Sequence, residues 1–187
     1  MNIYLMRHLQ STDNEQGIYG AQSDASLSES GMERAEEIAP TVAQNTYDLI
    51  IVSPLQRTRQ TIEPYIKTLQ NPNIIVEPLI IERGLGVFTG TRREDGLLNE
   101  HREQQGLGKV LWKPPQGESI VDVYHRAKKF IEKFRSMKVE NVLVVSHQNF
   151  IRNFELILQG KDALEYYADD ANLFENGEIR KYILTNN

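Results

Sequence analysis

The stretch NVLVVSH, residues 141–147, places four consecutive apolar residues directly before a serine and a histidine. A second apolar run, DLIIV, occupies residues 48–52. Continuous apolar runs are typical of strands buried on both faces, as in a parallel sheet covered by helices. Because such runs alternate here with amphipathic stretches, we predict an α/β fold with three layers, α/β/α, around a mostly parallel central sheet.

Further strands are predicted on either side of these two runs. NIYLM at residues 2–6 and IIVE at residues 74–77 are short and apolar. EIRKYIL at residues 178–184 carries charges that favour a position at or near an edge of the sheet. Helices are predicted over four amphipathic stretches, which are residues 28–44, 53–69, 119–137 and 149–158.

The predicted helix over residues 53–69 has several sequence signals at its start. Ser53 is expected to be the N-cap, Pro54 lies in the first turn, and Gln56 completes a capping box with Ser53. Pro64 is expected to kink this helix, and Pro40 to bend or end the helix before it.

Residues 83–117 differ from the rest of the chain because they are rich in glycine, arginine and glutamate. This composition predicts loops with a short helix. A chain of 187 residues is long enough for one proper core. We therefore expect a single domain, residues 1–187, in which the segment 83–117 is a lid or insertion over the active site.

Composition excludes several classes of function. The absence of cysteine rules out disulfides, Cys-ligated zinc and a thiol nucleophile. The N-terminus is charged too soon for a signal peptide, and no apolar run approaches the ~20 residues that cross a bilayer, so a cytoplasmic location without membrane contact is expected. The net charge of -5 argues against nucleic-acid binding but allows a locally positive pocket for a small anionic substrate. A homodimer is compatible with the sequence, which leaves the oligomeric state open.

Charged and titratable residues follow three of the predicted strands. Arg7 and His8 follow the first strand, Arg57 lies one turn into the helix after the second, and His147 follows a third. In a parallel sheet the ligand crevice lies beyond the carboxyl ends of the strands. The predicted fold would therefore bring two arginines and two histidines to one crevice.

This set of side chains suits a tetrahedral dianion. Arginine forks pair well with phosphate oxygens, and a neutral imidazole can attack phosphorus to form a phosphohistidine. The leaving alkoxide then needs a proton from a nearby carboxylic acid. Glu82 ends the run PLIIE just before a glycine-rich loop and is the candidate for that acid.

Four segments, RHLQSTDN, SPLQRTRQT, ERGLGVFTG and VVSHQNFIRNF, resemble the ordered signatures of the histidine phosphatase superfamily, also called the phosphoglycerate mutase-like superfamily. GAQSDASLSESG resembles the segment that follows the first signature, so the resemblance covers most of the chain. It implies a phosphoglycerate mutase-like fold and a metal-independent phosphatase with no cofactor. By this resemblance His8 is the nucleophile, Glu82 is the proton donor and later the base, and Arg7, Arg57 and His147 hold the phosphoryl group.

Five further residues are predicted to contact the substrate. Asn14 matches a family position that contacts the phosphate, and Tyr19 and Gly20 lie in the loop that follows it. Arg83 comes directly after the acid, as it does in the mutases of the family. Gln148 follows the second histidine, where it adds a donor to the ligand.

The chain departs from the family pattern at two positions, because Leu9 and Gln148 stand where the family usually has glycine. Glycine permits positive φ and close backbone approach. A side chain at residue 9 or 148 is expected to narrow the pocket or shift the carbonyl that orients the first imidazole. These departures motivate one alternative function, a non-catalytic binder of phosphorylated ligands.

The predicted activity is a phosphomonoesterase acting on small phosphorylated metabolites through a phosphohistidine. A phosphoglycerate mutase or bisphosphoglycerate-type phosphotransfer is the other enzymatic alternative. LWKPPQGES lacks the paired arginines of the long mutase segment, which favours hydrolysis. Basic residues in the loop segment favour a ligand with additional negative charge, whereas aromatic ones favour an aromatic or nucleotide leaving group. The basic set is Arg83, Arg92, Arg93 and Lys113, and the aromatic set is Tyr19, Phe88 and Trp112.

Overall fold

The computed structural model describes residues 1–166 and 173–184 and contains a mixed sheet with five strands. The strands are β1 (Asn2–Arg7), β2 (Leu49–Val52), β3 (Ile74–Val76), β4 (Asn141–Ser146) and β5 (Ile179–Ile183). Their order is β3-β2-β4-β1-β5, and only the β1–β5 pairing is antiparallel. The predictions of a mostly parallel sheet and of an edge position for the last strand are confirmed.

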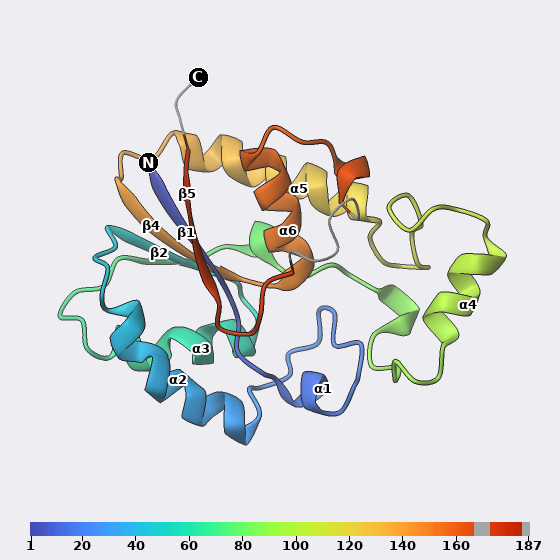
Figure 1. Ribbon diagram of the computed structural model, residues 1–187, viewed down its shortest axis with the longest axis horizontal. Coiled ribbons are helices and arrows are strands. Elements are labelled where there is room, and N and C mark those ends of the chain that lie inside the picture. The colour runs from blue at the N-terminus through green and yellow to red at the C-terminus, as the bar shows by residue number, and fades with distance from the viewer. Residues whose placement is uncertain (167–172, 185–187) are drawn as a thin grey trace.

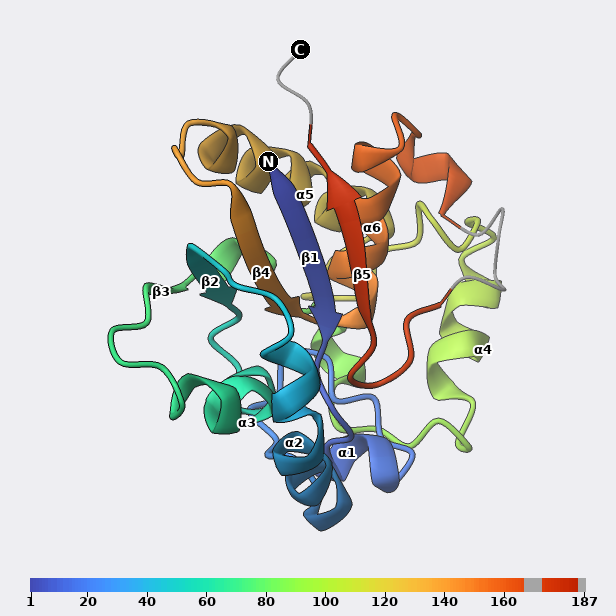
Figure 2. The same ribbon diagram turned by 60° about the vertical axis from the view of Figure 1, so that its left-hand side comes forward.

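Four helices cover the two faces of this sheet. Helices α2 (Glu29–Val42) and α3 (Gln56–Ile66) pack on one face, and α5 (Ile120–Arg135) and α6 (Gln148–Leu158) pack on the other (Figures 1 and 2). Alternate strand residues divide between the faces, so Leu5 and Val144 contact α5 and α6 while Met6 and Val145 contact the α2–α3 side. Burial on both faces explains why these strands are apolar at successive positions.

The short elements lie at the ends of this framework. Helix α1 spans Thr12–Glu15 and α4 spans Leu97–Gln104. Three 3-10 turns are η1 (Pro78–Ile80), η2 (Gly86–Phe88) and η3 (Ala163–Glu165). Among the residues that the structure describes, every helix is too short or too polar to cross a bilayer.

The predicted capping of the second main helix is wrong. Helix α3 begins at Gln56 with Leu55 as its N-cap, and no side chain of that residue caps it. The Ser53 hydroxyl lies instead 2.7 Å from Nε2 of His147. The backbone N–H of Gln56 donates to Oδ1 of Asp24 at 2.6 Å, so a carboxylate from a distant loop satisfies it.

Neither internal proline ends its helix early. Pro40 lies inside α2, which continues to Val42, and Pro64 lies inside α3, which continues to Ile66. Each helix stops two residues later, so the missing N–H of each proline falls in the last turn, where the packing of the helix on the sheet outweighs it.

The segment 83–117 contains η2 and α4, as the prediction of loops with a short helix requires. Helix α4 stands away from the sheet in both ribbon views (Figures 1 and 2). The segment has a small apolar core of its own, formed by Phe88, Leu98 and Trp112, with Tyr19 packed against it. The buried position of Trp112, which is 1% exposed, makes it part of this packing.

Two glycines in this segment allow a matched test of its anchoring. Gly86 (φ 53°) lies so close to the turn after Pro114 that a Cβ would be 1.8 Å from the carbonyl oxygen of Pro115. Gly90 (φ 86°) shares the left-handed conformation, but nothing lies within 4 Å of its Cβ position. We expect Gly90→Ala to cost about 1–2 kcal/mol of stability, the usual penalty for a side chain at positive φ.

Gly86→Ala is expected to cost clearly more than Gly90→Ala, and to raise KM for a phosphomonoester, because the turn at residues 115–117 must move. Urea denaturation of both variants, with phosphate-release kinetics, measures this difference. Equal losses in the two variants would show that the contact between residues 86 and 115 does not hold the segment in place.

Candidate active site

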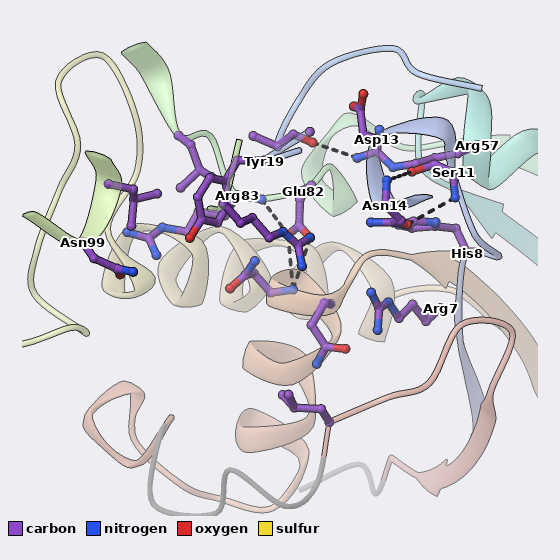
Figure 3. A pocket seen from close by; sticks show the side chains of 18 of the residues that line it. Arg7, His8, Ser11, Asp13, Asn14, Tyr19, Arg57, Glu82, Arg83 and Asn99 are labelled. Carbon is purple, nitrogen blue, oxygen red and sulfur yellow. Dashed lines mark hydrogen bonds between the residues drawn. The ribbon is translucent and has the colours of Figure 1, made fainter. Parts of the chain in front are cut away.

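One cavity of about 440 Å³ opens at the carboxyl ends of β1 and β2. The register brings its parts together, since the N–H of His8 donates to the carbonyl of Ser146 at 3.0 Å and that of Ser53 to Val145 at 3.1 Å. Figure 3 shows the side chains that surround the cavity. Those predicted from the sequence and found in its lining are Arg7, His8, Asn14, Tyr19, Gly20, Arg57, Glu82, Arg83 and Gln148.

His8 is held in one defined orientation. Its side chain is 4% exposed, and Nδ1 lies 2.6 Å from the carbonyl oxygen of Leu9. A carbonyl only accepts hydrogen bonds, so Nδ1 carries the ring proton and Nε2 keeps its lone pair. Burial, and next the charge of Arg57, lower the pKa of His8 well below 6.5. His8 is therefore neutral at pH 7, with one nitrogen available as a nucleophile.

The two arginines predicted at the crevice are anchored by backbone carbonyls. Arg57 donates from Nη1 to Ser23 and from Nη2 to Ala21, both at 2.7 Å. Arg7 donates from Nη1 to Phe174 at 2.6 Å, while its buried Nε has no partner among the described residues. Because a guanidinium has five N–H donors, each arginine keeps others for a ligand.

Ala21 adopts φ 46°, a left-handed conformation that side chains other than glycine rarely adopt. Its carbonyl accepts from Arg57, so the strained residue helps to aim a guanidinium at the pocket. Nothing in the sequence signals this conformation, since alanine has no preference for it.

His147 is completely buried, and its ring centroid lies 5.1 Å from that of His8. It is not among the residues that line the cavity. Nε2 is 2.7 Å from the Ser53 hydroxyl, and Nδ1 has no hydrogen-bond partner in the part of the chain described. Burial, followed by the charge of Arg57, lowers the pKa of His147 well below 6.5, so this ring is also neutral at pH 7.

Glu82 lines the cavity close to the start of α6. Its Oε1 accepts from the backbone N–H of Arg83 at 2.7 Å and from that of Asn149 at 3.2 Å. Its backbone carbonyl accepts from Gln22 and from Arg126, at 2.8 and 3.3 Å. The carboxyl group is therefore fixed at the pocket wall, facing the same cavity as His8 (Figure 3).

The other predicted contact residues have different surroundings. Asn14 caps its own short helix, because its Oδ1 accepts from the N–H of Ser11 at 3.2 Å. Gly20 is needed for space, since a Cβ there would lie 2.5 Å from Oδ2 of Asp13. Arg83 donates from Nε and Nη2 to two carbonyls of the segment that follows, so it also holds that segment against the pocket.

The two departures from glycine have different outcomes. The expectation that Leu9 narrows the pocket is wrong, because its side chain is buried in the α2–α3 core, outside the cavity lining. It packs against Gly177, where a Cβ would lie 2.7 Å from Cδ2 of Leu9. The carbonyl of Leu9 still orients His8. Gln148 does line the cavity, and its two buried amide atoms have no hydrogen-bond partner among the described residues.

Sequence reasoning missed part of the cavity lining. The residues not predicted as contacts are Ser11, Asp13, Ala21, Leu85, Leu98, Asn99, Arg102, Asn149 and Leu173, whereas Arg93 of the predicted basic set does line the cavity. Ser11 and Asp13 belong to a quoted signature, and Asn99 and Arg102 have the i,i+3 spacing that places them on one face of a helix. The predicted basic residues Arg92 and Lys113 lie outside the lining and pair with Glu94 and Asp122.

Within residues 1–166 and 173–184, no three His, Asp or Glu side chains are placed together as metal ligands.

The sheet order and the cationic pocket at its carboxyl edge define an α/β enzyme of phosphoryl transfer. The chain belongs to the histidine phosphatase superfamily (branch 1), whose family model matches residues 3–174. The resemblance drawn from the four signatures is thus confirmed, together with the fold class.

Two curated relatives and one solved structure illustrate the range of this family. Phosphoserine phosphatase 1 of Hydrogenobacter thermophilus is 30% identical over 90% of this chain and 81% of its own length. A 2,3-bisphosphoglycerate-dependent phosphoglycerate mutase of Parvibaculum lavamentivorans is 29% identical over 84% of this chain and 78% of its own. The alpha-ribazole phosphatase structure from Shigella flexneri has a TM-score of 0.84 at 21% identity, covering 97% of this chain and 89% of that one.

Proposed function

We propose that this protein is a phosphomonoesterase that hydrolyses small phosphorylated metabolites through a phosphohistidine intermediate. The observation that carries the proposal is the state of His8. Its Nδ1 proton is directed at the Leu9 carbonyl, which leaves Nε2 as a nucleophile beside two anchored arginines. The match to a phosphoserine phosphatase along nearly the whole chain supports hydrolysis.

In the first step Nε2 of His8 forms a bond to phosphorus, and the ester P–O bond breaks. Glu82 gives its proton to the leaving oxygen, while Arg7 and Arg57 stabilise the charge on the equatorial oxygens. In the second step Glu82 takes a proton from water, the water oxygen attacks phosphorus, and the P–N bond breaks. The products are an alcohol, inorganic phosphate and the starting enzyme.

His147 supplies a further donor in this scheme. The Ser53 hydroxyl can donate to Nε2 of His147, which leaves the proton on Nδ1, the buried atom without a partner. An unpaired buried donor is costly, and a phosphoryl oxygen would satisfy it. Asn14 would contact the phosphoryl group, whereas Tyr19, Gly20, Arg83 and Gln148 would contact the rest of the ligand. The buried amide atoms of Gln148 would gain partners when the ligand binds.

Residues 83–117 would act as a lid within a single domain. Five cavity-lining residues of this segment, beginning with Leu85 and ending with Arg102, support this role together with Arg83 at its base. A cytoplasmic location and the absence of a nucleic-acid partner stay predictions from the sequence, which is compatible with a homodimer and leaves the oligomeric state open.

A mutase is the second candidate, because one relative of similar identity is a phosphoglycerate mutase. Hydrolysis is favoured by the surroundings of Lys113, which pairs with Asp122 at 3.1 Å and does not face the cavity. A non-catalytic binder is disfavoured because the Leu9 carbonyl still orients His8.

Product analysis separates these functions. The protein is incubated with 3-phosphoglycerate in a chelating buffer, and the products are identified by ³¹P NMR. We expect inorganic phosphate, with no dependence on added metal. Formation of 2-phosphoglycerate would favour the mutase, and saturable binding without turnover of this or an aryl phosphate would favour the binder.

A further inference from the structure

The cavity has a second end, remote from the nucleophile. Figure 3 shows His8, Arg57 and Asn14 at one end and Asn99 at the other, with Tyr19 and Glu82 between them. A cavity of about 440 Å³ falls in the ~300–1,000 Å³ range of sites that hold whole small molecules. It therefore has room for a substrate that reaches from His8 toward the lid segment.

The lid segment contributes two cations to the cavity lining besides Arg83, namely Arg93 and Arg102. Arg102 donates from Nη2 to Oδ1 of Asn99 at 3.0 Å, which orients its guanidinium. Arg93 stacks on the Tyr19 ring, with Cζ 5.5 Å from the ring centroid. Within the described part of the chain, neither arginine has a carboxylate within ion-pair distance.

Nearby acidic residues do not neutralise these two arginines. Glu94, Asp95, Glu100 and Glu103 are exposed on the same segment, but none of them lines the cavity. Glu94 pairs instead with Arg92, which also lies outside the lining. Arg93 and Arg102 thus line the cavity, whereas these four acidic residues face solvent.

The carboxylates that do line the cavity are already engaged. Asp13 accepts from the Ser23 hydroxyl at 2.5 Å, and Glu82 accepts from two backbone N–H groups. Against these two carboxylates the cavity has five arginines, in a chain whose net charge is -5. Such a concentration of positive charge is unfavourable without negative charge nearby. One phosphoryl dianion supplies only part of the negative charge that is needed.

The charge of Arg93 extends to the phosphoryl end. Burial is the main cause that lowers the pKa of Arg7, Glu82 opposes this shift, and Arg93 lowers the pKa further. Arg93 and Arg7 therefore repel each other within this one cavity.

Aromatic recognition of the leaving group has less support. Phe88 and Trp112 are buried in the core of the lid segment and do not line the cavity. Tyr19 lines it, but its ring already contacts Arg93.

We propose that the preferred substrates carry a second anionic group, a carboxylate or a second phosphate, which Arg93 and Arg102 of the lid segment bind, with Asn99 holding Arg102 in place. This inference rests on the proposed function and specifies its substrate class. Guanidinium forks pair well with either anion.

The test compares phosphomonoesters that differ only in the second charge. One pair is 3-phosphoglycerate and glycerol 3-phosphate, in which a carboxylate replaces a hydroxymethyl group. A second pair is fructose 1,6-bisphosphate and fructose 6-phosphate, which asks whether a second phosphate serves as well. kcat/KM is measured for the wild type, Arg93→Gln, Arg102→Gln and the control Arg92→Gln, which removes an exposed charge next to the proposed subsite.

For at least one pair, we expect the wild-type kcat/KM to be about tenfold or more higher for the member with the second anionic group. This is the usual contribution of a hydrogen bond between charged groups. Arg93→Gln and Arg102→Gln should each lower kcat/KM for that member by about tenfold. Both variants should change kcat/KM for the member without the second anionic group by less than about twofold. Arg92→Gln should leave the ratio of kcat/KM between the two members unchanged. The pair in which this preference occurs shows whether the subsite binds a carboxylate or a phosphate.

Equal kcat/KM within both pairs, or equal effects of Arg92→Gln and Arg93→Gln, would overturn the proposed subsite. Phosphate release from these substrates would still support the proposed function. If no phosphate is released from any of them, the proposed function fails. In that case, titration calorimetry of the same compounds with the same variants tests the subsite separately from catalysis. The same preferences are then expected in the binding affinities.

Discussion

Replacing His8 with alanine is expected to lower phosphate release by about 10⁴-fold or more, the loss seen when a covalent nucleophile is removed. His8 is neutral and buried, and its Nε2 atom is the nucleophile assigned to the first step. Water can replace it only through a different transition state. The measurement is phosphate release from 4-nitrophenyl phosphate, with trapping of an acid-labile, base-stable phosphoenzyme in the wild type.

The matched control is His125→Ala, because His125 is exposed on α5 and remote from the cavity lining. This variant should keep wild-type activity and form the phosphoenzyme. Circular dichroism of both variants excludes unfolding as the cause of any loss. Substantial phosphate release by His8→Ala, or a phosphoenzyme that survives the substitution, would contradict the assignment of His8 as the nucleophile.

Glu82→Gln is expected to slow cleavage of alkyl phosphates by roughly 10²- to 10⁴-fold, the typical contribution of a general acid. Glutamine keeps an oxygen that can accept from the N–H groups of Arg83 and Asn149, so the side chain stays in place. It has no acidic proton to give to the leaving oxygen.

The choice of leaving group makes this prediction sharp. The first-turnover rate is measured by rapid quench for glycerol 3-phosphate and for 4-nitrophenyl phosphate, whose leaving group needs no proton. The variant should lose far more on the alkyl ester than on the aryl ester. Steady-state turnover of both esters should fall, because Glu82 also activates the water of the second step. Glu94→Gln, which changes an exposed carboxylate of the lid segment, should have no effect. Equal first-turnover losses on the two esters would rule out Glu82 as the acid.

Local sequence patterns were sufficient for most of the framework. The runs at residues 49–52 and 142–145 are apolar at every position because both faces of their strands are covered. This continuous pattern predicts a parallel sheet, and a parallel sheet brings the residues after its strands to one edge. The sequence pattern therefore predicts the grouping of Arg7, His8 and Arg57 that the cavity lining shows.

Local patterns failed where a side chain has two competing partners. Ser53 has the spacing of a helix N-cap, yet its hydroxyl bonds to His147, which lies 94 positions away in the chain. The departure from the family's glycine predicts that Leu9 narrows the pocket, but its side chain fills the space that Gly177 leaves beside the core. Neither outcome can be read from neighbouring residues, because each depends on a contact between distant segments.

The sequence by itself determined the layered α/β fold, the family and the residues that gather at the carboxyl ends of the strands, because each of these depends on short-range periodicity or on ordered motifs. Only the tertiary structure decided which nitrogen of His8 is free, where the Leu9 side chain lies, and which cations of the segment 83–117 face the cavity. Arg92 and Arg93 are neighbours in the chain, yet only Arg93 lines the pocket. The direction of a loop side chain is set by the packing of the whole segment, which no local pattern records.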